Sequence, residues 1–205
     1  MCDDLGEVLD QKHIIDIGAG SGKLWETALK KGLSPKRLDL LDPALNISQA
    51  LERKSCVYPL RGGLESFGTS TADVAFFKQS FHLALKCLGD ALFDYYLPGH
   101  TCVVLYMPHK PEWPISPAFC DLYKTKEVII EDIARNAGKS VIKQTRFDFP
   151  VIMSRKEWCD MLRARFTTTL HSVDNNFIEN EIKWVEDHYP GILSFNDPLK
   201  CLIFR

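Results

Sequence analysis

Apolar runs alternate with amphipathic segments along the chain, and this alternation predicts alternating strands and helices. Near-continuous apolar runs are typical of strands that are covered on both faces of a sheet. The predicted strands cover residues 14–17, 37–42, 56–60, 74–77, 101–107, 141–149 and 197–204. This order predicts the α/β class, with a doubly wound, seven-stranded, mostly parallel sheet and helices on both faces.

Helical spacing of apolar residues marks the segments between these strands. Ser154 and Glu157 form a capping-box pattern at the start of one helix, because the serine side chain and the glutamate three residues later satisfy free backbone donors. Gly32 and Gly138 follow two helices as C-terminal caps. The predicted helices cover residues 23–31, 44–54, 84–97 with a break near Gly89, 119–137, 154–162 and 177–188.

A glycine-rich turn between the first strand and the first helix indicates a nucleotide site. The stretch is His13-Ile14-Ile15-Asp16-Ile17-Gly18-Ala19-Gly20-Ser21-Gly22. Glycines let a ligand approach the backbone closely, and the helix that follows starts at that point. A phosphate-cradling P-loop is disfavoured because Ile17 occupies the position of its first glycine and Leu24 replaces the magnesium-binding hydroxyl.

The dinucleotide fingerprint fits the turn less well than a cationic ligand does. Lys23 stands where the third glycine of that fingerprint is required. Asp16 would repel a pyrophosphate, at a cost of about 1–4 kcal/mol for unit charges 4 Å apart. S-adenosylmethionine carries an ammonium and a sulfonium and no phosphate, so it is the better match to a carboxylate at this place.

The stretch Ile14–Gly22 resembles the first motif of the class I S-adenosylmethionine-dependent methyltransferases, and the chain is most similar to the small-molecule methyltransferases of the type 11 group. The resemblance extends from Ile14 to Phe204 and is most specific at Asp16–Gly22. It implies a Rossmann-like methyltransferase fold, S-adenosyl-L-methionine as cofactor, and transfer of its methyl group to a small-molecule acceptor. Cofactor binding is thereby assigned to Asp16, Gly18, Ala19, Gly20, Gly22, Asp42, Pro43, Leu64, Glu65, Lys78 and Gln79.

Asp42 ends the second predicted strand and precedes Pro43, a pair that resembles the second motif of the family. A carboxylate at this place accepts hydrogen bonds from two adjacent ribose hydroxyls. The alternative is that Asp42 only caps the next helix. Leu64 and Glu65 follow the third strand, where the family places the adenine.

Residues 72–82 form the second strong signal, in which a buried strand runs into a polar end. In the family this end lies beside the methionine part of the cofactor, which places Lys78 and Gln79 there. His82 is the candidate catalytic residue, because a histidine with a pKa near 6.5 suits proton removal from an acceptor. The alternative is a histidine that only lines the pocket wall.

Composition and charge exclude several classes of protein. The chain has 205 residues, a formal net charge of −2 and a pI near 6.3, which gives no basic footprint for a nucleic-acid partner. It has no apolar run long enough for a membrane span. The seven cysteines show no C-x-x-C spacing, which favours free thiols in a reducing, cytoplasmic setting and no metal site.

We expect one methyltransferase domain over residues 1–205, with a short N-terminal segment at 1–12. The proline-rich stretch 108–117 is a candidate lid, in which Trp113 either contacts substrate or simply packs. Two alternatives to a methyltransferase stay open. One is a non-catalytic cofactor-binding or interaction module with this fold, and the other is an NAD-dependent oxidoreductase.

Overall fold

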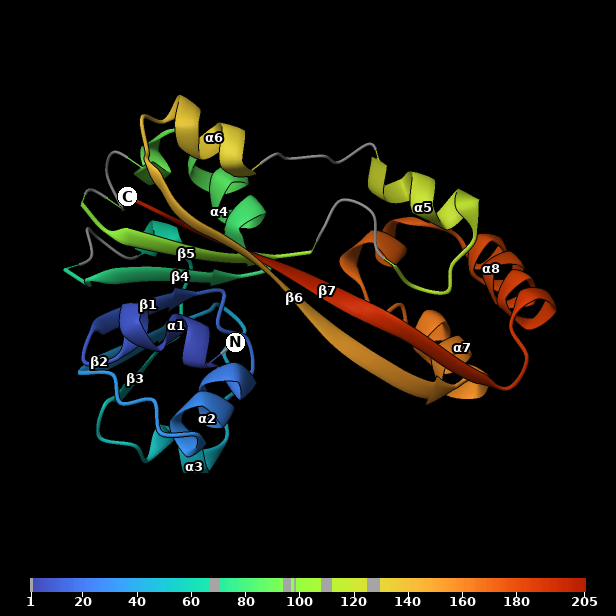
Figure 1. Cartoon of the computed structure of the whole chain (residues 1–205), viewed down its shortest axis with the longest axis horizontal. Coiled ribbons are helices and arrows are strands. Elements are labelled where there is room, and N and C mark those ends of the chain that lie inside the picture. The colour runs from blue at the N-terminus through green and yellow to red at the C-terminus, as the bar shows by residue number, and fades with distance from the viewer. Residues whose placement is uncertain (1, 67–70, 94–96, 98, 108–111, 125–129) are drawn as a thin grey trace. The chain divides into compact units, whose positions relative to one another are not determined.

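The computed structural model describes residues 2–66, 71–93, 97, 99–107, 112–124 and 130–205 (Figure 1). The chain divides into two compact units. Unit 1 comprises residues 1–106, 129–145 and 200–205, and unit 2 comprises residues 107–128 and 146–199. Whether the two units act as one methyltransferase domain stays a prediction.

The predicted sheet is confirmed: seven strands run in the order β3-β2-β1-β4-β5-β7-β6. Strands β1 to β5 pair in parallel, and β7 is antiparallel to β5. The two last strands are longer than predicted, and each contributes residues to both units. The strands are β1 (His13–Ile17), β2 (Arg37–Leu41), β3 (Val57–Leu60), β4 (Val74–Lys78), β5 (Thr101–Tyr106), β6 (Val141–Ser154) and β7 (Ile192–Phe204).

Both faces of the sheet in unit 1 carry helices, as the apolar strands predict. One face packs against α4 (Phe81–Leu88) and α6 (Ile130–Asn136), through buried residues that include Phe77, Phe81 and Ala134. The opposite face packs against α1 (Cys2–Leu9) and α2 (Lys23–Lys30) (Figure 1), and Trp25 of α2 lies against Phe76 of β4.

The strand order reverses direction at β1, which has β2 on one side and β4 on the other. Because these strands are parallel, their carboxyl ends meet at one edge of the sheet. The loops after β1 and β4 lead to helices on opposite faces of the sheet and so separate at this point. Open α/β sheets bind their ligands at such a switch point.

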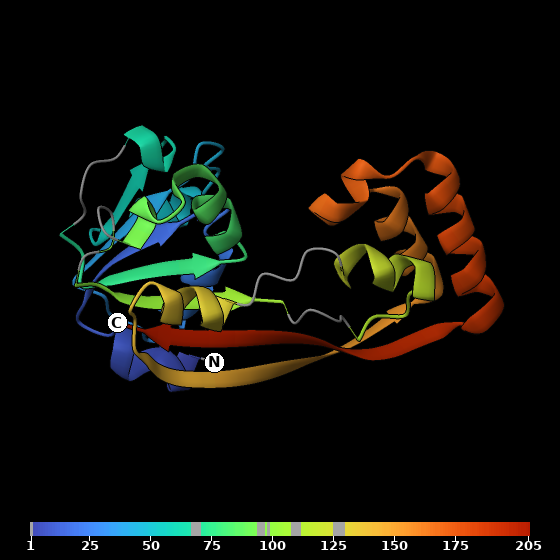
Figure 2. The ribbon, with the colours of Figure 1, turned by 90° about the horizontal axis from the view of Figure 1, so that it is seen from above.

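Unit 2 has its own apolar core. It contains α5 (Pro117–Lys124), α7 (Arg155–Arg163), the 3₁₀ helix η3 (Thr168–Ser172) and α8 (Asn175–His188), and α7 packs against α8 (Figure 2). The predicted capping box is confirmed, since Ser154 Oγ accepts from the backbone N–H of Glu157, and Glu157 Oε2 accepts from the backbone N–H of Ser154 at 2.8 Å. Phe119, Trp158 and Leu162 are fully buried in this core.

Two helix predictions are wrong in extent. The segment predicted as a helix over 44–54 forms only α3 (Gln49–Glu52), which the Ser48 side chain caps by accepting from Leu51 N at 3.2 Å. The segment 119–137 contains two helices that pack in different units, α5 in unit 2 and α6 in unit 1. The break predicted near Gly89 in the helix over 84–97 is confirmed, since α4 ends at Leu88, Gly89 has φ 53° and residues 91–93 are helical again; residues 94–96 lie outside the described residues.

Among the described residues, no helix is both long and apolar enough to span a bilayer.

Candidate functional site

The glycine turn after β1 is held against the end of β2 by backbone hydrogen bonds. Gly18 N and Ala19 N both donate to Leu41 O, at 2.8 and 3.2 Å. Gly22 N donates to Ala19 O at 3.0 Å and closes the turn, and α2 begins at the next residue. The turn therefore lies at the carboxyl edge of the sheet, where the sequence predicts it.

The three glycines of the turn have positive φ angles, but different surroundings. A Cβ on Gly18 would lie 2.4 Å from Ser80 Cβ, and a Cβ on Gly22 would lie 2.6 Å from Leu51 Cδ2. Packing against Ser80 Cβ therefore requires glycine at position 18, whereas position 22 is crowded by the ends of side chains. A Cβ on Gly20 would meet no described atom within 4 Å, so Gly20 is the glycine whose backbone is open to a ligand.

Asp42 connects the glycine turn to the segment that follows β2. Its Oδ2 accepts from Gly20 N at 2.9 Å, and its Oδ1 accepts from Ala44 N at 2.7 Å. The carboxylate is half-buried, and each oxygen keeps a second lone pair for a further donor. Ser48 caps α3, so Asp42 is not the cap of that helix. Pro43, next to it, is exposed.

Asp16 is the most unusual ionisable group of the site. Its side chain lies on β1 with the residue 3% exposed, and Trp25 Nε1 donates to its Oδ2 across 2.6 Å. Its Oδ1 is buried and has no hydrogen-bond partner among the described atoms. Desolvation raises the pKa of Asp16 to about 7, although the Trp25 hydrogen bond and Lys78 lower it and Asp42 raises it further.

The unpaired Asp16 oxygen indicates a ligand. Most buried polar atoms in proteins are hydrogen-bonded, because an unpaired one costs about 1–3 kcal/mol. A ligand ammonium supplies both the missing donor and a compensating charge. The residues present therefore suit a cationic ligand and not a phosphate.

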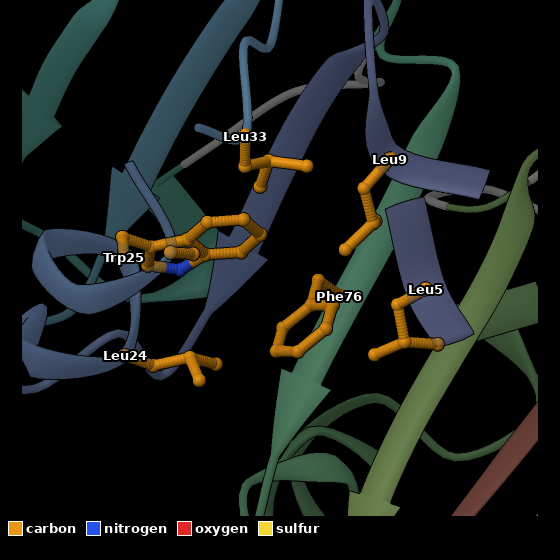
Figure 3. A pocket seen from close by; sticks show the side chains of 7 residues that line it. Leu5, Leu9, Leu24, Trp25, Leu33 and Phe76 are labelled. Atoms are coloured by element: carbon orange, nitrogen blue, oxygen red, sulfur yellow. The ribbon is translucent and has the colours of Figure 1, made fainter. Parts of the chain in front are cut away.

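Trp25 is a site residue that the sequence analysis missed. In the sequence it is only one apolar residue of the helix predicted over 23–31, although a buried indole N–H needs an acceptor. Its ring packs edge-to-face on Phe76, with ring centroids 5.0 Å apart. Trp25 also lines a small apolar cavity of about 20 Å³, together with Leu5 and Leu9 of α1 (Figure 3). Helix α1 therefore borders, across this cavity, the residue that holds Asp16.

The end of β4 is tied to its two neighbours. Ser80 Oγ donates to Ile17 O at the end of β1, and Gln79 N donates to Leu105 O of β5 at 2.7 Å. Gln79 has φ 59°, a left-handed conformation that is uncommon outside glycine and often found at functional sites. Lys78 is exposed but close enough to Asp16 to lower its pKa. His82 is exposed in the first turn of α4.

Leu64 and Glu65 form part of the 3₁₀ helix η1 (Leu64–Ser66), which follows β3. Leu64 is buried in the same cluster as Ile17 and Leu41, at the ends of β1 and β2. Glu65 is exposed, and its carboxylate lies against Gly63, where an added Cβ would fall 2.2 Å from Oε1. Both residues lie at the expected edge of the sheet.

Trp113 of the candidate lid packs in the core of unit 2. Its ring lies 5.3 Å from that of Phe166 and 6.1 Å from that of Trp158, and its Nε1 donates to Asp197 Oδ1 at 2.9 Å. The structure thus gives Trp113 a packing role. Residues 108–111 lie outside the described residues, so a lid over 108–117 stays a prediction.

A second polar group at the carboxyl edge was also missed. Tyr106 at the end of β5 donates its hydroxyl to Glu131 Oε1 of α6 at 2.8 Å, and Gln144 Nε2 donates to the same oxygen at 2.6 Å. The only signal in the sequence is a tyrosine at the end of an apolar strand, since its two partners lie far along the chain. Among the described residues, no group of three or more His, Cys, Asp or Glu is arranged to hold a metal ion.

The chain thus has the fold of a doubly wound α/β protein, with a glycine turn at the switch point of its sheet. No protein-family model matches the sequence, and a search of curated proteins found no match. Solved structures do match, and they share the fold of S-adenosylmethionine-dependent methyltransferases.

Three of these structures span nearly the whole chain. A protein from Bacillus halodurans C-125 assigned as a methyltransferase is 13% identical with a TM-score of 0.58, covering 100% of this chain and 97% of its own. A mycolic acid cyclopropane synthase complexed with S-adenosylhomocysteine is 15% identical with a TM-score of 0.51, covering 98% and 82%. A Geobacter sulfurreducens S-adenosylmethionine-dependent methyltransferase in complex with S-adenosylhomocysteine is 14% identical with a TM-score of 0.50, covering 100% and 90%.

Proposed function

We propose that this protein binds S-adenosyl-L-methionine and transfers its methyl group to a small-molecule acceptor. The observation that carries the proposal is the buried Asp16 carboxyl, which has one unpaired oxygen and lies on β1 just before the glycine turn. The shared fold supports the same conclusion, since two of the similar structures hold S-adenosylhomocysteine.

The residues at the switch point would each contact a different part of the cofactor. Asp16 would accept from the ammonium of the methionine part, which relieves its unpaired oxygen. The open backbone at Gly20 would lie against the ligand, while Gly18 and Gly22 keep the turn in shape. Asp42 would accept from the ribose hydroxyls with its remaining lone pairs, and its bonds to Gly20 N and Ala44 N hold it in place.

The other predicted residues keep their proposed roles at the same edge. Ala19 and Pro43 would border the ligand beside Gly20 and Asp42. Leu64 and Glu65 would flank the adenine, and Lys78 and Gln79 would border the methionine part.

Methyl transfer requires few catalytic groups from the protein. Bound S-adenosylmethionine would supply an electrophilic methyl carbon, with the sulfur as leaving group that keeps the electron pair of the broken bond. The protein contributes chiefly by holding the acceptor in line with that bond. His82, exposed at the start of α4, would take the proton from an acceptor that carries one.

The two alternatives make different demands on the same residues. An NAD-dependent oxidoreductase would place a pyrophosphate beside Asp16, whose position and environment favour a cation. A non-catalytic module would bind the cofactor and transfer nothing. Cofactor binding therefore separates the first alternative from the proposal, and turnover separates the second.

Isothermal titration of the full chain with S-adenosylhomocysteine, with NADH as the parallel ligand, is the direct test. We expect S-adenosylhomocysteine to bind with micromolar affinity and NADH not to bind. Asp42→Ala should weaken binding by about 1–3 kcal/mol, because charge-assisted hydrogen bonds to the ribose are lost. Asp187→Ala, at an exposed position of α8, is the matched control and should leave affinity unchanged.

NADH binding in place of S-adenosylhomocysteine would reverse the assignment of the cofactor. Unchanged affinity in Asp42→Ala would remove Asp42 from the ribose site. Tight S-adenosylhomocysteine binding without methyl transfer from radiolabelled S-adenosylmethionine to a panel of amines, phenols and carboxylic acids would favour the non-catalytic module.

A further inference from the structure

Glu131 is a carboxylate that hydrogen bonds orient and that no cation among the described residues neutralises. Its Oε1 accepts from Tyr106 Oη at 2.8 Å and from Gln144 Nε2 at 2.6 Å, both of which are neutral donors. No ion pair joins Glu131 to a described lysine or arginine side chain, and no hydrogen bond to its Oε2 occurs among the described groups. Glu131 itself is half-buried, so it keeps access to solvent.

This arrangement differs from the other carboxylates of the chain that form ion pairs. Asp39 pairs with Arg37 at 2.7 Å, and Glu26 pairs with Lys30 at 2.9 Å, so their charge is compensated within the protein. Glu131 instead accepts from two neutral donors with one oxygen, so these contacts do not compensate its negative charge. A carboxylate held in this orientation can form a strong, charge-assisted hydrogen bond with a positively charged group.

The place of Glu131 in the fold connects it to the switch point. Leu105, the residue before Tyr106, accepts from Gln79 N at 2.7 Å, so the carboxyl ends of β5 and β4 are joined directly. Tyr106 faces the side of the sheet that α4 and α6 cover, and His82 lies in the first turn of α4. Burial is the main cause that raises the pKa of Tyr106, and its hydrogen bond to Glu131 raises this pKa further. The Tyr106 hydroxyl therefore stays protonated and can act as a donor.

We propose that Tyr106, Glu131 and Gln144 form the recognition site for a positively charged amino group of the methyl acceptor, so that the acceptor is an amine-bearing small molecule. This inference rests on the proposed methyl transfer and adds the class of acceptor. Glu131 binds the ammonium group of the acceptor. Tyr106 and Gln144 are positioning residues, because they fix the carboxylate and contact the acceptor only through it.

The test uses three small probes of similar size and different charge: benzylamine, benzyl alcohol and benzoate. Each is titrated into the ¹⁵N-labelled full chain saturated with S-adenosylhomocysteine, and the side-chain amide signal of Gln144 is followed by NMR. We expect benzylamine to shift this signal saturably and the other two probes to leave it in place. Glu131→Gln should weaken benzylamine binding about tenfold or more, since the amide has no charge.

Two variants separate recognition from folding. Asp132→Asn, on the same helix at an exposed carboxyl that faces Arg135, is the matched control and should bind benzylamine as the wild type does. Tyr106→Phe keeps the charge of Glu131 and loses one positioning bond, so it should give a smaller loss than Glu131→Gln. S-adenosylhomocysteine affinity, measured on every variant, should stay unchanged.

The outcomes distinguish this inference from the function on which it rests. Wild-type protein that binds no S-adenosylhomocysteine would overturn the proposed function, and the acceptor assignment with it. Protein that binds S-adenosylhomocysteine normally but binds benzylamine and benzoate alike, or keeps benzylamine affinity in Glu131→Gln, would overturn the inference alone.

Discussion

The indole of Trp25 donates to Asp16 Oδ2 across 2.6 Å and leaves Asp16 Oδ1 buried without a partner. One oxygen of this carboxyl is therefore held by the protein, and the other is the atom that the proposed cofactor would reach. The helix that carries Trp25 also begins at the glycine turn, so one element sets both the turn and the orientation of the acid.

Trp25→Phe should destabilise the protein by about 1–3 kcal/mol, because it keeps an aromatic ring near Phe76 but leaves a second oxygen of Asp16 unpaired. Urea unfolding at pH 7 measures the change. Trp184→Phe, which replaces a tryptophan of unit 2, controls for the loss of an indole as such. Equal stability of Trp25→Phe and wild type would mean that the hydrogen bond contributes nothing to the fold.

The free protein should lose stability as the pH rises from about 4 to about 7. The folded pKa of Asp16 is raised to about 7 from 3.8, so the folded state holds a proton through this window that the unfolded state releases. The contribution of Asp16 is complete below the unfolded pKa and is lost as the pH passes the folded one, with a slope of at most about 1.4 kcal/mol per pH unit. Asp16→Asn should remove this part of the slope in urea unfolding, and an identical pH profile in the variant would contradict the assignment.

Cofactor affinity should have the opposite dependence on pH. An ammonium favours the ionised form of Asp16, so binding near neutral pH releases the proton that the free protein holds. S-adenosylhomocysteine should bind more tightly at pH 8 than at pH 6, and its binding enthalpy should vary with the ionisation enthalpy of the buffer. Asp16→Asn should bind weakly with little pH dependence. Calorimetry in two buffers at each pH measures both effects, and the absence of proton release in the wild type would argue against contact between Asp16 and the ammonium.

The first two glycines of the turn should respond differently to alanine. Gly18→Ala should lower the melting temperature strongly, since its Cβ would fall 2.4 Å from Ser80 Cβ. Gly20→Ala has open space and should cost only about 1 kcal/mol for its left-handed backbone, while S-adenosylhomocysteine affinity falls. Gly18→Ala combined with Ser80→Gly should recover part of the lost stability. Similar melting temperatures for the two single variants would show that the packing around Gly18 gives way easily.

Much of the architecture is predictable because it depends on local patterns. The apolar strands, the glycine turn and the capping box at Ser154 each depend on neighbouring residues, and the structure has all of them. The helix predicted over 44–54 fails for a long-range reason. Asn46 N donates to Gly20 O at 3.1 Å, so the segment before Ser48 is held on the glycine turn and does not start a helix.

The partners within the site are harder to predict than its motifs. The position of Asp16 is visible in the sequence, but its bond to Trp25 depends on how α2 lies on the sheet. Glu131 and Gln144 come from segments well beyond β5, and only the folded chain brings them to Tyr106. Pattern reasoning therefore finds the residues that a motif contains and misses those that meet through tertiary contacts.

The close approach of Ser80 to Gly18 bears on how such sequences drift over evolutionary time. A descendant that lost its ligand would still need a glycine at position 18, because a side chain there would collide with its own neighbour. Position 20 would be released from that requirement once no ligand had to approach the backbone. Among distant copies of this chain, retention of the second glycine is therefore the more informative mark of a working binding site.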